Sequence, residues 1–218
     1  AGRVFEALGA GALDAVATPG LAPDGSVVNA EALIRKVHAI GVIAGTGNAG
    51  SPRSFSSASA PRLEHAVVPP IVAIGASTGG PLALSVILKS LPHPAPWPIV
   101  VVQHVDPEFA PGLASWLAND TGHTVETIVE GSTPKAGRVS IAATGDHALL
   151  CGDGRLRYSP DPRDLVYRPS VDVFFESLVG AAVAPGVAVV LTGMGRDGAA
   201  GLSRLRSVGW HTIAQDRA

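Results

Sequence analysis

The chain has 218 residues, of which 16 are lysine or arginine and 18 are aspartate or glutamate, so its formal net charge is −2. Only 16% of the residues are charged, and the chain holds 26 glycines and 18 prolines. This composition excludes collagen, a coiled coil and a charged disordered tail, and the lack of a basic run argues against a nucleic-acid partner. The single cysteine, Cys151, cannot form an intramolecular disulfide, which is typical of a reducing, cytoplasmic compartment.

Two long uncharged stretches, residues 66–88 and 177–195, raise the question of a membrane span. Prolines and glycines interrupt both, which favours a helix and a buried strand joined by a turn, so we expect no membrane insertion. The N-terminus has no signal-peptide pattern, because Glu6 and Asp14 interrupt it. The chain opens on Ala1 without an initiator methionine, so we expect it to be part of a longer protein.

A change in composition divides the chain. Residues 46–62 consist mostly of serine, alanine, glycine and proline, which predicts a linker over residues 46–66. The 45 residues before it are too few for an independent core. In this first segment we expect a helix near residues 3–8, a strand near 15–17, a turn at Pro19 and Gly20, and a helix near 30–40.

From residue 67 onward, short apolar strands alternate with helices. The predicted elements, in chain order, are a strand at 71–74, a helix at 81–91, a strand at 99–103, a helix at 111–119, strands at 124–129 and 138–143, a hairpin of 148–150 with 156–158, a helix at 171–184, a strand at 187–191, a helix at 199–207 and a strand at 212–214. This order predicts an α/β fold with a doubly wound, mostly parallel sheet, helices on both faces and a short antiparallel hairpin excursion.

Three polar residues follow three of these apolar strands. Ser77 comes after the strand at 71–74, His104 after that at 99–103 and Asp197 after that at 187–191. In open α/β sheets the loops at the carboxyl ends of the strands form the ligand site. Serine, histidine and aspartate are the residue types of a nucleophile, a base and an orienting acid.

The turn after the first strand also matches the G-x-S-x-G pattern through Gly75, Ser77 and Gly79. That pattern is typical of a sharp strand-to-helix turn that exposes a serine hydroxyl, and Pro81 suits the first turn of the following helix. The pattern alone is weakly specific, because the glycine-rich turn of residues 75–80 (Gly75 to Gly80) also suits the phosphates of a nucleotide. A dinucleotide site would want an acidic residue after the second strand, where the chain has Gln103 and His104.

Each of the three residues also has an ordinary structural interpretation. Ser77 suits a helix N-cap, His104 a buried or loop histidine, and Asp197 a turn or N-cap. Their placement after three separate strands favours a catalytic set over these separate explanations. A non-catalytic regulatory domain is the remaining alternative.

No metal or cofactor site is expected, because the other histidines are scattered without metal-ligand spacing. Among them only His147 follows a predicted strand closely enough to line the same cleft. Cys151 lies beside the predicted hairpin without a base partner, so we interpret it as structural.

The sequence resembles the chemotaxis protein-glutamate methylesterases, which are also protein-glutamine glutaminases. The resemblance covers most of the region after the linker and rests on IVAIGASTGGPLAL at 71–84, VVVQH at 100–104, RPSVDVFFESL at 168–178, VLTGMGRDGAAGL at 190–202 and AQD at 214–216. It implies a hydrolase that removes methyl esters from glutamate side chains of chemoreceptors, without a cofactor.

Within this resemblance the nucleophile falls on Ser77, the base on His104 and the orienting acid on Asp197. Thr78 follows the nucleophile, and the methionine whose backbone N–H belongs to the oxyanion hole falls on Met194. Two family positions differ, because Val105-Asp106-Pro107 follows the base where Met-Pro is common and Tyr167 stands where histidine commonly precedes Arg-Pro-Ser-Val-Asp. The family also normally continues beyond Ala218.

The segment before the linker resembles the end of a response-regulator receiver domain, so residues 1–45 are expected to be a receiver remnant and 67–218 a methylesterase domain. The resemblance implies two partners, namely the cytoplasmic helices of methyl-accepting chemoreceptors as substrate and a histidine kinase that acts through the receiver. Thr18 stands before Pro19 where a receiver typically has lysine.

Overall fold

The computed structural model describes residues 4, 20–21, 27–28, 68–181, 183–191 and 195–215. The expected helices and strand near residues 3–8, 15–17 and 30–40 lie outside these residues, except that Val4 is helical. Two short antiparallel strands, β1 (Gly20–Leu21) and β2 (Val27–Val28), were not expected. Gly20, which we predicted in a turn, is instead the first residue of β1.

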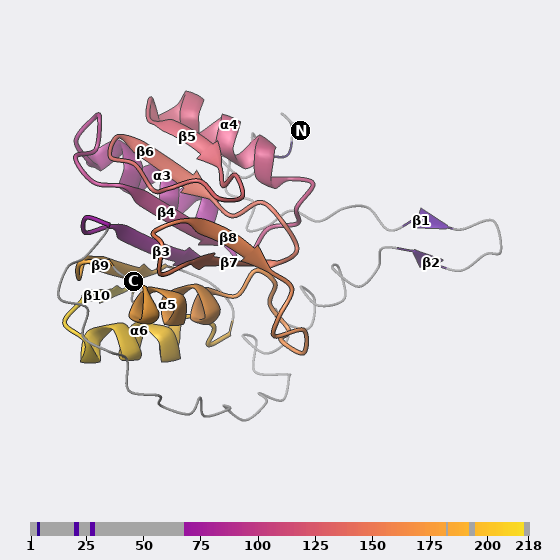
Figure 1. Cartoon of the computed structure of the whole chain (residues 1–218). Coiled ribbons are helices and arrows are strands. Elements are labelled where there is room, and N and C mark those ends of the chain that lie inside the picture. Colours follow the sequence, from indigo (N-terminus) through magenta and orange to yellow (C-terminus); the bar gives the residue numbers. More distant parts are fainter. Residues whose placement is uncertain are drawn as a thin grey trace.

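The main sheet has six parallel strands in the order β10-β9-β3-β4-β6-β5 (Figure 1). Their bounds are Val72–Ala76 for β3, Ile99–Gln103 for β4, Thr124–Thr127 for β5, Arg138–Ile141 for β6, Val187–Val190 for β9 and His211–Ala214 for β10. The predicted α/β class is therefore confirmed, since each described strand of this sheet runs parallel to its neighbours.

The central strands are buried on both faces, which explains why they read as continuous apolar runs. All five residues of β4 are buried. Successive side chains of a strand point to opposite faces. Accordingly, Val100 and Val102 belong to one core cluster, whereas Ile99 and Val101 belong to the other.

Two helix pairs cover the two faces of the sheet. On one face lie α3 (Gly80–Ser90) and α4 (Ala110–Thr121), and on the other α5 (Val171–Gly180) and α6 (Ala199–Ser207), which lie together below the sheet in Figure 1. Leu84 and Leu117 are fully buried from the first pair, and Phe175 and Leu205 from the second. Among the described residues, no helix has the length and hydropathy needed to cross a membrane.

The antiparallel hairpin excursion is also confirmed, as β7 (His147–Leu150) paired with β8 (Leu156–Ser159) in a separate two-stranded sheet. Several boundaries differ from the prediction: the strand expected over 138–143 ends at Ile141, the strand expected over 71–74 spans Val72–Ala76, and two further cases have a visible cause. The helix expected over 171–184 ends at Gly180, because the following chain extends and Val183 forms a bridge with Val68. The strand expected over 124–129 ends at Thr127, because a turn begins at Val129.

Candidate active site

The order in which the chain adds strands to the sheet reverses between the neighbouring strands β3 and β9. These strands are neighbours in the sheet, but β3 leads through α3 to β4 on one side, whereas β9 leads through α6 to β10 on the other. Loops diverge at such a switch point and leave a crevice at the carboxyl ends of the strands. Ser77 follows β3 and Asp197 follows β9, so both border this crevice.

The turn that carries Ser77 is built on glycine. Gly79 has φ +78°, which strongly favours glycine, and it is the N-cap of α3 without a side-chain capping bond. The N–H of Gly80 donates to the carbonyl of Ser77 at 2.7 Å, which closes the turn. Ser77 is therefore not the helix cap, and the capping alternative for this residue is wrong.

Gln103 is a supporting residue that the sequence did not identify. Its side chain is buried, and its Nε2 donates to the carbonyl oxygen of Ser77 at 2.8 Å and to that of His104 at 3.3 Å. Gly80 leaves room for it, since a Cβ there would meet the Gln103 Oε1 at 2.1 Å. Gln103 thus holds the serine turn against the end of β4.

Strand register brings Ser77 and His104 side by side. Ala76 pairs with Gln103 in the parallel ladder, and the two site residues come directly after this pair. The N–H of His104 also donates to the carbonyl of Ala76 at 2.9 Å. Among the described residues, no hydrogen bond joins the Ser77 hydroxyl to His104, which is common for a catalytic pair without substrate.

The His104 ring is largely buried, and its two nitrogens differ in their partners. Nε2 lies 2.8 Å from Oδ2 of Asp197, whereas Nδ1 is buried without a hydrogen-bond partner. Because a carboxylate only accepts, the network assigns the proton of the neutral ring to Nε2. Nδ1 is therefore the nitrogen that can accept a proton.

The carboxylate of Asp197 accepts four hydrogen bonds at the N-terminus of α5. Oδ1 accepts from the Ser170 hydroxyl at 2.7 Å and the Asp172 N–H at 3.0 Å, while Oδ2 accepts from the Val171 N–H at 2.7 Å and from His104. Burial acts to raise the pKa of Asp197, but these bonds and the attraction to His104 outweigh it and lower the pKa below its ordinary value. Asp197 is thus held ionised as the partner of His104 and does not cap its own helix.

A second carboxylate mirrors this arrangement. Asp172, in the first turn of α5, accepts from the N–H of Gly201 at 2.7 Å and from the N–H of Gly198, at the N-terminus of α6. The two helices therefore exchange carboxylates: Asp197, just before α6, binds the N-terminus of α5, and Asp172 of α5 binds the N-terminus of α6. Burial is the main reason why the pKa of Asp172 is raised, and the nearby charge of Asp197 raises it further.

His147, which we expected to be able to line the cleft, binds the residue that holds Asp197. It is fully buried, accepts from the N–H of Ser170 at Nδ1 (3.0 Å), and so donates from Nε2 to the carbonyl of Pro162 at 3.0 Å. Ser170 in turn holds Asp197. The RPSVD stretch at 168–172 was the only sequence signal for Ser170 and Asp172, and it gave no role to either.

The two residues expected at the oxyanion hole differ in what the structure shows of them. Thr78 is half-buried and lies between Ser77 and the N-cap of α3. Met194 lies outside the described residues, between β9 and Asp197. Among the described residues no group of three or more metal-ligating side chains forms.

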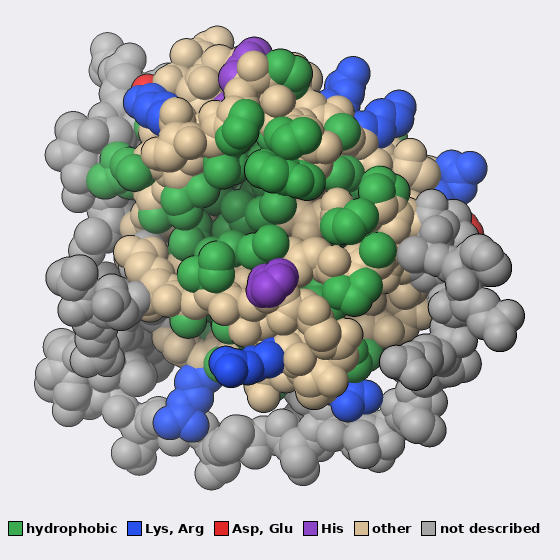
Figure 2. All heavy atoms as spheres, turned by 90° about the vertical axis from the view of Figure 1, so that its left-hand side faces the viewer, with side chains coloured by type: hydrophobic (Ala, Val, Ile, Leu, Met, Phe, Trp, Pro, Cys, Tyr) green, Lys and Arg blue, Asp and Glu red, His purple; other side chains and the backbone are tan. Residues whose placement is uncertain are grey.

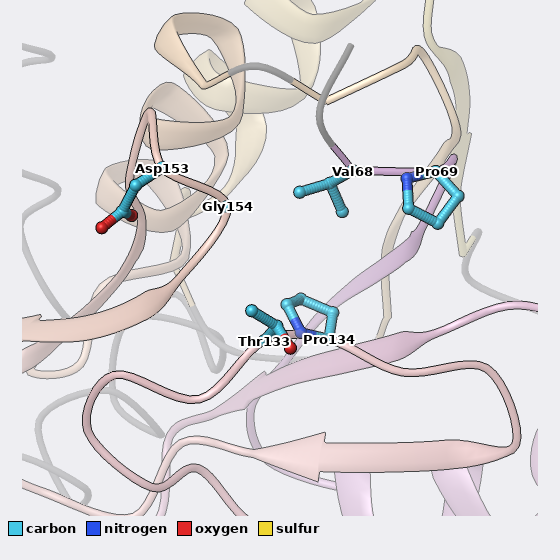
Figure 3. A pocket seen from close by; sticks show the side chains of 6 residues that line it. All are labelled: Val68, Pro69, Thr133, Pro134, Asp153 and Gly154. Carbon is cyan, nitrogen blue, oxygen red and sulfur yellow. The ribbon is translucent and has the colours of Figure 1, made fainter.

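A pocket of about 230 Å³ lies at the opposite end of β3 from Ser77 (Figure 3). It is lined by Val68, Pro69, Thr133, Pro134, Asp153 and Gly154. This end of the sheet is the face shown in Figure 2, where hydrophobic side chains predominate around a hollow. Among the described lining residues Asp153 is the one titratable group, and it is bound to Arg157 at 2.7 Å, so these residues do not supply the convergent groups that a catalytic site needs.

A family model and the most similar relatives that we compared point to the same family of proteins. A family model described as CheB methylesterase matches residues 72–218. The whole chain is 48% identical to protein-glutamate methylesterase/protein-glutamine glutaminase 4 of Burkholderia thailandensis, and 216 residues are 47% identical to the enzyme of the same name from the group 3 operon of Pseudomonas putida. The chain spans 63% of the length of each of these relatives.

A solved structure agrees with the fold. The CheB methylesterase catalytic domain of Thermotoga maritima superposes with a TM-score of 0.63 at 38% identity, over 69% of this chain and 82% of that one. The doubly wound sheet, with a serine, a histidine and an aspartate after the carboxyl ends of three neighbouring strands, defines an α/β protein. The chain belongs to the CheB methylesterase family.

Proposed function

We propose that residues 67–218 are a serine hydrolase domain that removes methyl esters from glutamate side chains of chemoreceptors and also deamidates receptor glutamines. The single observation that carries this proposal is the polarity of His104, which binds an ionised Asp197 through Nε2 and leaves Nδ1 buried without a hydrogen-bond partner, in a residue that strand register places next to Ser77. The names of the relatives supply the reacting groups, which are glutamate and glutamine side chains of proteins, and the family resemblance supplies the chemoreceptors.

In the first step, the Ser77 hydroxyl oxygen attacks the carbonyl carbon of the methyl ester while Nδ1 of His104 takes the hydroxyl proton. Asp197 holds the ring and stabilises the imidazolium that forms. The tetrahedral intermediate then collapses: the bond to the methoxy oxygen breaks, Nδ1 returns its proton to that oxygen, and methanol leaves. The product of this step is a glutamyl ester of Ser77.

The negative oxygen of the intermediate needs donors near Ser77. Thr78 begins the approach to the N-terminus of α3, where backbone N–H groups and the helix dipole favour negative charge. We assign the oxyanion hole to backbone N–H groups near Met194, which the family resemblance implies, and near Thr78, which follows the nucleophile.

In the second step, Nδ1 takes a proton from water, the hydroxide oxygen attacks the acyl carbon, and the Ser77 oxygen leaves with that proton. A glutamine substrate follows the same path, except that ammonia replaces methanol as the first product. Loss of a triad member in such a system lowers kcat by roughly 10⁴–10⁶.

The partners belong to the longer protein. We propose that residues 1–45 are the end of a receiver domain through which a histidine kinase controls the enzyme in the cytoplasm, and that residues 46–66 are the linker. Two facts support this division: the relatives match along the entire chain, while the methylesterase family model begins only at residue 72.

The direct test is methanol release from a methylated receptor preparation. The wild-type chain is expected to release methanol and Ser77→Ala to release none above background. Ser90→Ala is the matched control, because this exposed serine lies at the far end of α3 and bonds only its own helix, at the Val86 carbonyl. Equal methanol release by the wild type and Ser77→Ala would refute the proposal.

A further inference from the structure

We infer that Tyr167 is a positioning residue for His104, because its phenol ring forms a stacked wall that fixes the plane of the imidazole. This inference rests on the proposed function, in which His104 transfers the proton. The two rings are stacked with centroids 4.5 Å apart and an angle of 4° between their planes. No role for Tyr167 follows from strand order or from the serine, histidine and aspartate pattern.

The stack restricts rotation of the His104 imidazole ring, which would move Nδ1 away from the Ser77 hydroxyl. The hydrogen bond from Nε2 to Asp197 fixes one point of the ring but leaves rotation about that direction free. A neighbouring ring against one face blocks this rotation and keeps Nδ1 in the plane where it can meet the Ser77 hydroxyl. It also keeps water from that face, since the His104 side chain is only 12% exposed.

The loop that carries Tyr167 is held on both sides, so the stack is preorganised. His147 joins the carbonyl of Pro162 to the N–H of Ser170, and Arg168 pairs with Asp146 at 3.0 Å. The same histidine therefore supports the loop of Tyr167 and the serine that binds Asp197. Residues whose positions are locked by neighbouring bonds can hold a catalytic group precisely.

A second contact fits Tyr167 into the site. A Cβ placed on Gly195 would lie 2.7 Å from the Tyr167 hydroxyl oxygen and 3.3 Å from its ring. Gly195 also has φ +103°, so any other residue there would be strained as well as crowded. The tyrosine thus stacks on His104 with its ring and brings its hydroxyl group close to Gly195, two residues before Asp197.

The chemistry of the ring suits this role. Burial, and then the charge of Asp197, raise the pKa of the Tyr167 phenol, so the side chain stays neutral at physiological pH. The face of a neutral phenol attracts a cation, which favours the imidazolium formed during proton transfer. Since the ring face provides this effect, phenylalanine at position 167 is expected to keep the function of the tyrosine, whereas a branched aliphatic side chain is expected to lose it.

The experiment compares Tyr167→Phe and Tyr167→Leu in the 218-residue chain. Tyr167→Leu is expected to lower kcat for methanol release by roughly 10- to 100-fold with little change in KM, because a misplaced base affects the chemical step. Tyr167→Phe is expected to retain most of kcat. Val166→Leu is the matched control, since this neighbouring side chain is 70% exposed.

A second readout does not depend on turnover. The imidazole N–H proton of His104 that is bound to Asp197 gives a low-field ¹H NMR resonance, which His104→Ala assigns by its loss. The resonance is expected in the wild type and in Tyr167→Phe, and is expected to broaden or vanish in Tyr167→Leu. The NMR comparison therefore tests whether Tyr167 positions His104, even if the proposed substrate is wrong.

The outcomes separate the two claims. If Ser77→Ala still releases methanol, the proposed function fails, and the NMR comparison still decides the role of Tyr167. If Tyr167→Leu keeps the wild-type kcat or the wild-type resonance, the positioning role is overturned while the proposed function stands. If Tyr167→Leu does not fold, Tyr167→Met replaces it, with the same expected loss of kcat and of the resonance. A large loss of kcat in Tyr167→Phe overturns the ring-stacking explanation whichever variant is used.

Discussion

The site consists of two halves that are held in different ways. In the strand half, Ser77 and His104 follow paired residues of β3 and β4, so main-chain register places them together. In the helix half, Asp197 is held by side-chain and backbone donors at the N-terminus of α5, and Asp172 returns the same kind of contact to α6.

This difference predicts different responses to mutation. A side chain of the strand half can change without disturbing the sheet, because the ladder bonds belong to the backbone. A carboxylate of the helix half is itself a structural link between α5 and α6, so its loss leaves buried donors unsatisfied. We therefore expect catalysis and stability to separate in the strand half and to change together in the helix half.

The largest expected effect is in the strand half. Ser77→Ala and His104→Gln are each expected to lower kcat by roughly 10⁴–10⁶, and the double variant by no more than either alone, because the two side chains act as one unit. Their melting temperatures are expected to stay near that of the wild type. Multiplicative losses in a kinetic cycle would show that the two side chains act independently.

Asp197→Asn comes next, and both activity and stability are expected to fall. Activity is expected to drop by about 10⁴-fold, because the amide no longer enforces the tautomer of His104. Stability is expected to fall by about 1–3 kcal/mol, since the amide NH₂ faces donors from α5. Activity assays and urea unfolding measure the two losses, and an unchanged midpoint would contradict the structural role.

The lowered pKa of Asp197 adds a pH dependence with a definite sign. Because the folded pKa is below the unfolded one, the stabilisation is complete above the ordinary aspartate value and is lost as the pH falls through the folded value. Asp197→Asn lacks this contribution. The stability difference between the two proteins is therefore expected to shrink in acid.

The contact between the halves is tested by Gly75→Ala. A Cβ at this position of β3 would lie 2.2 Å from a methyl carbon of Val171, the first residue of α5. Gly75→Ala is expected to cost about 1–3 kcal/mol of stability through overpacking. Adding Val171→Ala removes the two methyl carbons that clash and leaves only the Val171 Cβ, at 3.1 Å, so the double variant is expected to be more stable than the sum of the single effects. Strict additivity in a double-mutant cycle would contradict the contact.

The smallest effect is expected for Asp172→Asn, because the amide oxygen can still accept from Gly201. The raised pKa of Asp172 means that its contribution to stability falls as the pH rises from the ordinary aspartate value through the folded value. The asparagine variant lacks this fall. Its stability relative to the wild type is expected to increase with pH over that range, which is opposite in direction to the acid behaviour expected around Asp197.

The same contrast explains how much the sequence predicted. Apolar runs mark the strands of a parallel sheet, and the residues that follow them must meet at one edge, so the fold and the places of Ser77, His104 and Asp197 were accessible. Glycine spacing also marked the turn after β3, although the structure was needed to show that Gly79 and not Ser77 caps the helix.

The supporting residues were not accessible in this way. Gln103, His147 and Tyr167 act through contacts with segments distant in sequence, and no local pattern signals such contacts. The end of α5 was missed for the same reason, because the bridge between Val68 and Val183 draws the chain out of the helix. The predicted domain boundaries at 45 and 67, and the role of Met194, lie outside the described residues and remain predictions.

The central claim is that Ser77 is a nucleophile activated by His104. The most direct measurement is mass spectrometry of the chain after reaction with a serine-directed phosphonate. We expect a single adduct on the peptide that contains Ser77, no adduct in Ser77→Ala, and much slower labelling of Ser77 in His104→Gln. Labelling elsewhere, or equal labelling of Ser77 when His104 is replaced, would contradict it.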